Sequence, residues 1–97
     1  MKRDFIALLK DEVLELLKEE DVSVVLFGSR ARSDESVLSD VDIGVIPKGH
    51  FNRTKLVLLR EAVENMNIPY KIDIVDFSLV SKEFKEEALK KVEIWKD

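Results

Sequence analysis

The residues best suited to chemistry are two aspartates one residue apart, Asp40 and Asp42, in the segment 24–45. In an extended strand both side chains point to the same face, with their alpha carbons about 6.5 Å apart. Two ionised carboxylates this close repel each other unless a proton or a cation lies between them. Their hard oxygens suit Mg2+, which takes one or two protein carboxylates and completes its shell with water and substrate phosphates. The pair therefore predicts a magnesium site that handles a phosphate-containing substrate.

A third carboxylate, Asp73, lies in another apolar segment, between Ile72 and Ile74. If the strands that carry Asp42 and Asp73 are neighbours, the three aspartates can form one acidic cluster. Such a cluster suits two-metal phosphoryl or nucleotidyl transfer. Asp73 can also remove the proton of an incoming hydroxyl, a role that fits a carboxylate held near a metal.

A glycine–serine pair, Gly28 and Ser29, ends the first apolar run and begins a polar segment. Glycine lets the backbone approach a ligand closely, and a helix starting just beyond it presents free N–H groups to an anion. The Ser29 hydroxyl can donate to a phosphate oxygen. Arg30 and Arg32 can assist, although alternate positions on a helix do not share a face.

Each of these features is common when it occurs alone. A serine after a strand is often only a helix N-cap, and Asp-X-Asp pairs occur on many solvated strands. Asp73 by itself would be an ordinary surface residue, and a structural α/β domain with incidental aspartates is the corresponding alternative. The combination of these residues, in this order and at strand ends, favours a functional site.

Apolar periodicity predicts the elements that must position these residues. Helices are expected where apolar residues recur every three or four positions, and strands where they alternate or form short β-branched runs. In chain order, the expected elements are a helix over 4–20, a strand over 22–27, a short helix over 30–34, a strand over 40–45, a helix over 56–66, a strand over 70–77, and a last helix capped by residue 81 with a shared face from 84 to 95.

The expected fold is one α/β domain over residues 1–97, in the order α-β-α-β-α-β-α. A chain of 97 residues supports one hydrophobic core but not two. The sheet is expected to be small and mixed, with three strands or slightly more, and flanked by helices. Connections through whole helices make at least part of it parallel.

Composition narrows the classes of partner. The net charge of −4 disfavours binding to nucleic acid by bulk electrostatics, although a divalent cation can screen the phosphates of a nucleotide locally. The absence of cysteine excludes disulfides, thiolate metal sites and cysteine nucleophiles. Apolar stretches are far too short for a membrane span, and the N-terminal segment lacks the apolar core of a signal peptide. We therefore expect a soluble cytoplasmic protein without a membrane association.

Ten residues separate Ser29 from Asp40, which gives the pattern G-S-X10-D-X-D. With this pattern the sequence resembles the minimal nucleotidyltransferases of the DNA polymerase beta-like superfamily. The resemblance rests on the runs 28–32, 39–43 and 71–75, and covers nearly the whole chain because the expected element order is also that of the family. One departure is Ser33, where many members have glycine; it affects the expected loop geometry rather than the metal site.

The resemblance implies a nucleotidyltransferase that uses ATP or another NTP with Mg2+, at a site that holds two metal ions. The aspartates would be both the catalytic and the metal-binding residues, and the glycine–serine segment would hold the nucleotide phosphates. The residues expected in these two roles are Asp40, Asp42 and Asp73 for catalysis and metal binding, and Gly28, Ser29 and Arg30 for nucleotide binding.

The resemblance also implies a partner. Larger enzymes of the superfamily carry further domains that hold the base and the acceptor, whereas here only about one helix is expected after Asp73. Such a site is open on one side, so a second copy of the chain or a different protein is expected to cover it. Minimal nucleotidyltransferases of this kind are typically paired with a small helical HEPN-domain protein, as antitoxin and toxin. The acceptor is then expected to be a protein hydroxyl, and AMP the transferred group.

Two functions follow from these expectations. The first is a Mg2+-dependent nucleotidyltransferase that transfers NMP from an NTP to a partner protein. The alternative is a binding module, without catalysis or with little of it, that neutralises a helical partner by direct contact. The apolar Ile94–Trp95 pair near the C-terminus and the missing substrate-holding domain motivate this alternative.

Overall fold

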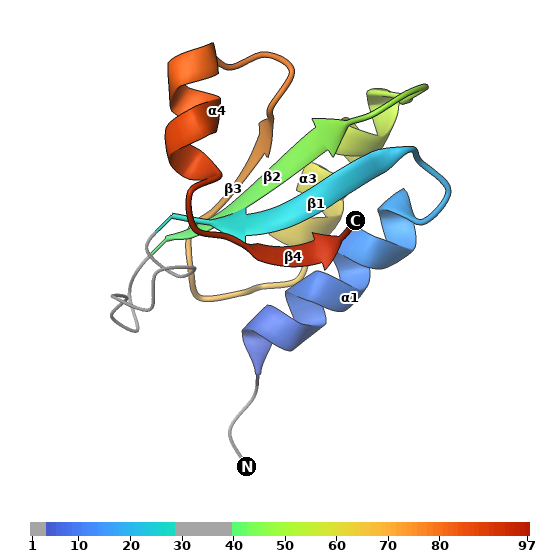
Figure 1. The fold of residues 1–97 in the computed structure, drawn as a ribbon. Coiled ribbons are helices and arrows are strands. Elements are labelled where there is room, and N and C mark those ends of the chain that lie inside the picture. The colour runs from blue at the N-terminus through green and yellow to red at the C-terminus, as the bar shows by residue number, and fades with distance from the viewer. Residues whose placement is uncertain (1–3, 29–39) are drawn as a thin grey trace.

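The structure is a computed structural model that describes residues 4–28 and 40–97 (Figure 1). The described elements follow one another in the order α1 (Phe5–Leu17), β1 (Val22–Phe27), β2 (Val41–Pro47), α3 (Thr54–Glu64), β3 (Ile72–Asp76), α4 (Lys82–Ala88) and β4 (Glu93–Lys96). The short helix expected over 30–34 lies outside the described residues.

The sheet is mixed and has the strand order β3-β2-β1-β4. β1 pairs antiparallel with both β2 and β4, whereas β2 and β3 pair parallel across the α3 connection. The parallel pairing confirms the expectation drawn from the helical crossover. The sheet has one strand more than the minimum expected, because β4 joins the free edge of β1.

The prediction of one long C-terminal helix is wrong. α4 ends at Ala88, and the chain turns back to form β4. In β4, Trp95 is 6% exposed and packs into the core, while its neighbour Ile94 is 59% exposed, which is the alternation of a strand. The helical spacing from Phe84 to Trp95 is therefore coincidental, since the two residues belong to different elements.

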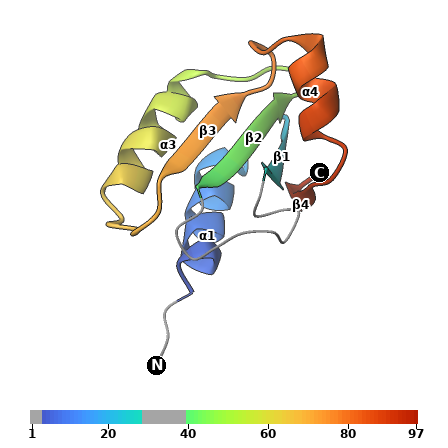
Figure 2. The same cartoon turned by 90° about the vertical axis from the view of Figure 1, so that its left-hand side faces the viewer.

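Helices cover the two faces of the sheet unequally. Figure 2 shows α1 and α3 together on one face and α4 alone on the other. The larger core lies under α1 and α3, where Leu9, Val13 and Leu59 meet the inward residues of β1 and β2. A smaller cluster of Val25, Phe27 and Phe77 lies on the opposite face, which we call the α4 face. β1 is thus a central strand buried on both faces, as its largely apolar run predicts.

Local side-chain bonds mark where the helices begin. The Asp4 carboxylate accepts a hydrogen bond from the Ala7 N–H at 3.0 Å and caps α1. The Ser81 hydroxyl accepts one from the Phe84 N–H at 3.0 Å and caps α4, as the sequence predicts. After α3, Asn67 takes a positive φ of 55°, a conformation that asparagine tolerates well, and the chain leaves the helix toward β3.

A buried carboxylate joins β3 to the start of α3. Asp76 is 5% exposed and accepts hydrogen bonds from Arg53 Nε at 2.9 Å and from the backbone N–H and hydroxyl of Ser78 at 2.9 and 2.6 Å. Burial by itself raises the pKa of Asp76, but the hydrogen bonds from Ser78 and the nearby charge of Arg53 outweigh it and hold this pKa below its usual value. The charged Asp76 carboxylate therefore holds the end of β3 to the start of α3.

Candidate active site

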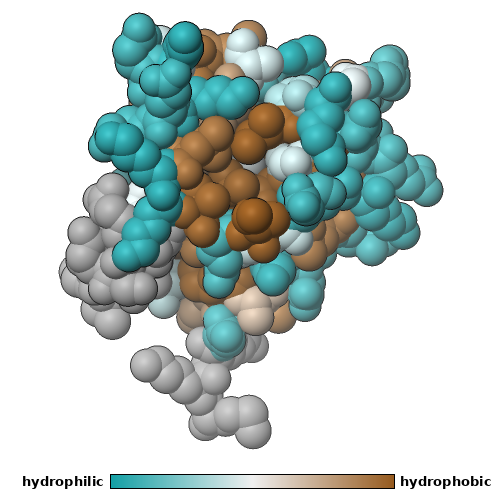
Figure 3. Space-filling view, in the orientation of Figure 1, coloured by the Kyte–Doolittle hydropathy of each residue, from teal (hydrophilic) through white to brown (hydrophobic). Residues whose placement is uncertain are grey.

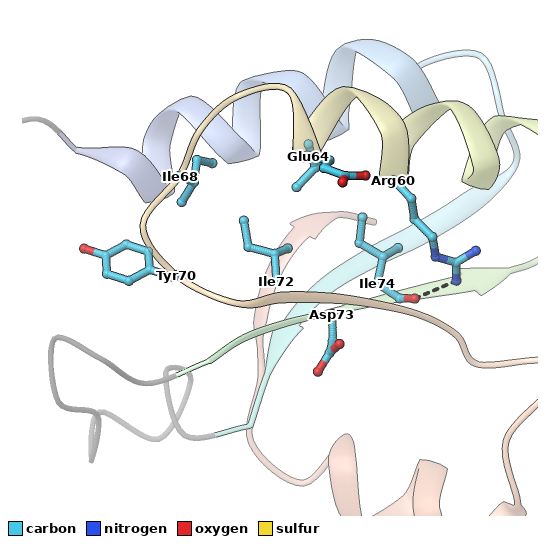
Figure 4. A pocket seen from close by; sticks show the side chains of 8 residues that line it. Arg60, Glu64, Ile68, Tyr70, Ile72, Asp73 and Ile74 are labelled. Carbon is cyan, nitrogen blue, oxygen red and sulfur yellow. Dashed lines mark hydrogen bonds between the residues drawn. The ribbon is translucent and has the colours of Figure 1, made fainter.

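Two of the three predicted aspartates lie side by side on neighbouring strands. Asp42 of β2 and Asp73 of β3 are register partners in the parallel pair. Ile43 and Ile74 pack into the core under α1 and α3, so by strand alternation both aspartates point to the α4 face. Figure 4 shows the Asp73 carboxylate pointing away from α3 and from the side chains of Ile72 and Ile74. The expectation that the two strands are neighbours is confirmed.

The third aspartate, Asp40, lies at the entrance of β2 and is exposed. Its charge acts on Asp42, two residues further along the chain. Burial, then the charge of Asp73, then the charge of Asp40 raise the pKa of Asp42, while Lys71 lowers it. The structure therefore brings the three carboxylates into electrostatic contact, with Asp42 at the centre.

This charge environment fits a hard divalent cation. A cation bound at Asp42 would offset the repulsion from Asp73 and Asp40, and all three side chains offer the oxygen ligands that Mg2+ prefers. Among residues 4–28 and 40–97, no group of three or more His, Cys, Asp or Glu side chains could hold a metal ion, so the structure does not gather the three aspartates into a three-carboxylate metal site. That site stays a prediction, and Mg2+ bound here would take one or two carboxylates and complete its shell with water and phosphate oxygens.

Gly28 lies against the central carboxylate. It follows β1, whose Phe27 is the register partner of Asp42, and it takes a positive φ of 78°. A Cβ placed on Gly28 would overlap Oδ2 of Asp42, so only glycine lets the backbone pass this closely. The predicted nucleotide-binding residues Ser29 and Arg30 lie outside the described residues.

One pocket, of about 450 Å³, opens beside β3 under α3 (Figure 4). Tyr70, Ile72 and Ile74 line it, and Arg60 closes one end by donating to the Ile74 carbonyl at 2.7 Å. Asp73 borders this pocket, but its carboxylate points to the opposite face of the sheet. The pocket is therefore separate from the carboxylate site.

A second pocket, of about 360 Å³, lies on the α4 face between the end of β1 and α4. We call it the β1–α4 pocket; its lining residues are Phe27, Gly28, Phe84, Glu87, Ala88, Lys90 and Lys91. Sequence reasoning missed the contribution of the two lysines, because it placed them inside a continuous helix. A signal was present in the β-branched and aromatic residues Val92, Ile94 and Trp95 just after them, a composition that favours a short strand.

The fold and site together define a class of protein. A small mixed sheet carries facing carboxylates on two neighbouring strands, with a glycine turn against one of them, and such an arrangement suits metal-assisted transfer of a phosphorus group. In the described part of the chain, no helix is both long and apolar enough to cross a bilayer.

Comparison with known proteins agrees with this class. The family described as Polymerase beta, Nucleotidyltransferase matches residues 11–96. The chain belongs to this family, and its enzyme class is nucleotidyltransferase.

Individual relatives share a low sequence identity with this chain. The chain is 27% identical over 86 residues to the probable protein adenylyltransferase MntA of Haemophilus influenzae, an alignment that covers 89% of this chain and 74% of that protein. A solved structure provisionally described as a minimal nucleotidyltransferase has a TM-score of 0.71 at 23% identity, with 96% of this chain and 95% of the other covered. These likenesses extend over most of both chains.

The fold also occurs in a solved complex. A structure of a tri-AMPylated Shewanella oneidensis HEPN toxin with its MNT antitoxin contains a chain similar to this one. The TM-score is 0.62 at 17% identity, and the match covers 92% of this chain and 70% of the other. At this identity the likeness shows a shared fold.

Proposed function

We propose that this chain is a Mg2+-dependent nucleotidyltransferase that transfers NMP, with AMP preferred, from an NTP to a hydroxyl of a partner protein. The observation that carries the proposal is the pairing of Asp42 with Asp73 across neighbouring strands, with Gly28 against Asp42. The family supports nucleotidyl transfer as the reaction class. The described relatives, a protein adenylyltransferase and an AMPylated toxin complex, support AMP and a protein acceptor.

In this reaction Asp40, Asp42 and Asp73 would hold Mg2+. When bound, Mg2+ stabilises negative charge on the phosphoryl oxygens. Asp73 takes the proton of the acceptor hydroxyl, whose oxygen forms a bond to the α-phosphorus. The bond between the α-phosphorus and the bridging oxygen breaks, and pyrophosphate leaves. Gly28 brings the backbone at the end of β1 close to the Asp42 carboxylate, as a turn that places phosphates beside a bound cation requires.

The test is transfer of labelled nucleotide. We expect the wild-type chain, with a HEPN-domain partner and Mg2+, to label the partner from ATP. Asp42→Asn should reduce the rate by about 1,000-fold, because metal stabilisation of transition-state charge is worth several kcal/mol. Asp11→Asn, which removes an exposed carboxylate on α1, is the matched control and should retain the wild-type rate. Absence of transfer by folded wild-type protein with any of the four NTPs would overturn the proposal.

Direct contact with the partner is the second candidate function. Figure 3 shows an apolar area over the sheet beside α4, on the face that α4 leaves partly open. Ile94 and Phe84, from the two elements that border this area, are 59% and 44% exposed. If Asp40→Asn with Asp42→Asn abolishes transfer yet leaves neutralisation of the partner at full strength, contact alone carries the function.

A further inference from the structure

The β1–α4 pocket borders the carboxylate site on the side away from β3. The strand order β3-β2-β1 places Asp73, Asp42 and Gly28 in sequence across one end of the sheet. Gly28 lies close to the Asp42 carboxylate and also lines the pocket. The pocket thus continues the line that begins at Asp73, on the same face of the sheet.

In nucleotidyl transfer the acceptor and the leaving group lie on opposite sides of the reacting phosphorus, so the row from Asp73 to Gly28 can be assigned an acceptor end and a leaving-group end. The attacking and leaving oxygens lie roughly opposite each other across the phosphorus. If Asp73 takes the proton of the acceptor, the acceptor enters from the β3 side. The pyrophosphate must then leave toward β1, which is the side of Gly28 and the pocket.

Two lysines of the pocket carry positive charge, which is opposite to the charge of pyrophosphate. Lys90 and Lys91 line the pocket just after α4, and both are exposed. Lys90 Nζ lies 2.9 Å from Glu87 Oε2, and hydrogen bonding and the charge of Glu87 raise the pKa of Lys90, so this amine stays protonated. Within residues 4–28 and 40–97, Lys91 forms no ion pair, so its ammonium is available to an anion. The charged residues of the pocket are these two lysines and Glu87, and the neighbouring carboxylate site contains Asp40, Asp42 and Asp73 with Lys71 near Asp42.

The apolar part of the pocket lining strengthens the attraction of the lysines for an anion. Phe27, Phe84 and Ala88 supply this apolar surface. Such walls lower the local dielectric, and a charge at the mouth of an apolar cleft acts on an anion with less screening by water.

We propose that the β1–α4 pocket binds the β- and γ-phosphates of the nucleotide, the future pyrophosphate, through Lys90 and Lys91. This inference rests on the proposed nucleotidyl transfer and gives it a direction, with the acceptor on the Asp73 side and the leaving group on the Lys91 side.

The experiment measures binding rather than turnover. The dissociation constants of ATP, AMP and inorganic pyrophosphate are measured by calorimetry with Mg2+ for the wild type, Lys90→Gln, Lys91→Gln and the double variant. We expect each lysine to contribute about tenfold to ATP and pyrophosphate affinity, as for a charged hydrogen bond, and to leave AMP affinity unchanged. Lys82→Gln removes an exposed cation at the first residue of α4, paired with Glu86 at 3.9 Å, and is the matched control with wild-type affinities.

The outcomes separate this inference from the proposed function. ATP binding that is unchanged in the double variant, or equal losses for ATP and AMP, would overturn the phosphate role of the pocket while nucleotidyl transfer stands. A wild-type chain that binds none of the three ligands would overturn both. The substituted side chains are exposed, so thermal unfolding of each variant should match the wild type.

Discussion

At the scale of single residues, the site depends on how closely the backbone of Gly28 approaches the Asp42 carboxylate. Two constraints meet at this glycine, a positive φ of 78° and the absence of room for a Cβ. Asp42 in turn lies between the charges of Asp73 and Asp40, which together with burial raise its pKa. Repulsion among these carboxylates therefore favours binding of a cation, and the glycine lets the backbone lie close to the Asp42 carboxylate.

Gly28→Ala should impair both the fold and the site. The left-handed conformation costs an alanine about 1–2 kcal/mol, and the new methyl group must displace the Asp42 carboxylate. We expect a lower free energy of unfolding in urea and weaker Mg2+ binding by calorimetry. Gly49→Ala is a matched control, because its Cβ would meet the side chain of Asp21 without a positive φ and away from the site. Equal effects of the two substitutions would contradict this account.

Asp42→Asn should stabilise the chain when divalent cations are absent. Above its pKa the wild-type carboxylate is ionised beside two like charges, and the amide removes that repulsion. We therefore expect a higher midpoint of thermal unfolding for the variant in EDTA at neutral pH. Added Mg2+ should raise the midpoint of the wild type more than that of the variant, since binding to the native state stabilises it. A variant that is less stable in EDTA would contradict the prediction.

At the scale of elements, the position of β3 is set by backbone pairing and by bonds to α3. Its parallel pairing with β2 places Asp73 opposite Asp42, and at its end Asp76 accepts hydrogen bonds from Arg53 and Ser78. α3 contributes again in the middle, where Arg60 donates to the Ile74 carbonyl. These bonds hold the edge strand against α3 and so help to keep Asp73 in register with Asp42 of β2.

Asp76→Asn should destabilise the chain by about 2 kcal/mol at pH 7, because the charged hydrogen bonds from Arg53 and Ser78 are weakened or lost in a buried setting. The folded pKa of Asp76 is lowered, so its contribution is present above the unfolded pKa and is lost as the pH falls through the folded value. Urea unfolding between pH 7 and pH 2 should show the difference between wild type and variant shrinking in acid. A difference that is constant over this range would contradict the charge-based explanation.

At the scale of the whole molecule, elements with a clear local pattern were predicted from the sequence, whereas β4 and the β1–α4 pocket, which depend on contacts between distant segments, were not. Alternation and β-branched runs predicted β1 to β3, and the Asp-X-Asp spacing predicted that Asp40 and Asp42 share a face. The grouping of Asp73 with them depended on β2 and β3 being neighbours, which the sequence did not determine. β4 was missed because the turn at Lys90–Lys91 contains neither glycine nor proline, and because Val92 and Trp95 happen to continue a helical spacing from Phe84. The β1–α4 pocket could not be predicted, since it depends on where that turn falls relative to Gly28.

The unequal covering of the sheet predicts where a partner protein binds. α1 and α3 bury one face, while α4 covers only part of the other, and Ile94 on β4 borders the open part with 59% of its surface exposed (Figures 1 and 2). Ile94→Asp should leave folding and nucleotide binding intact and weaken a HEPN-domain complex by about 30-fold, the equivalent of about 2 kcal/mol for a central interface residue. Val57→Asp, at a position 60% exposed on α3, is the matched control and should leave the complex unchanged in calorimetry. If Val57→Asp weakens the complex and Ile94→Asp does not, the partner binds the α3 side, and the open α4 face is then free for the acceptor and the nucleotide alone.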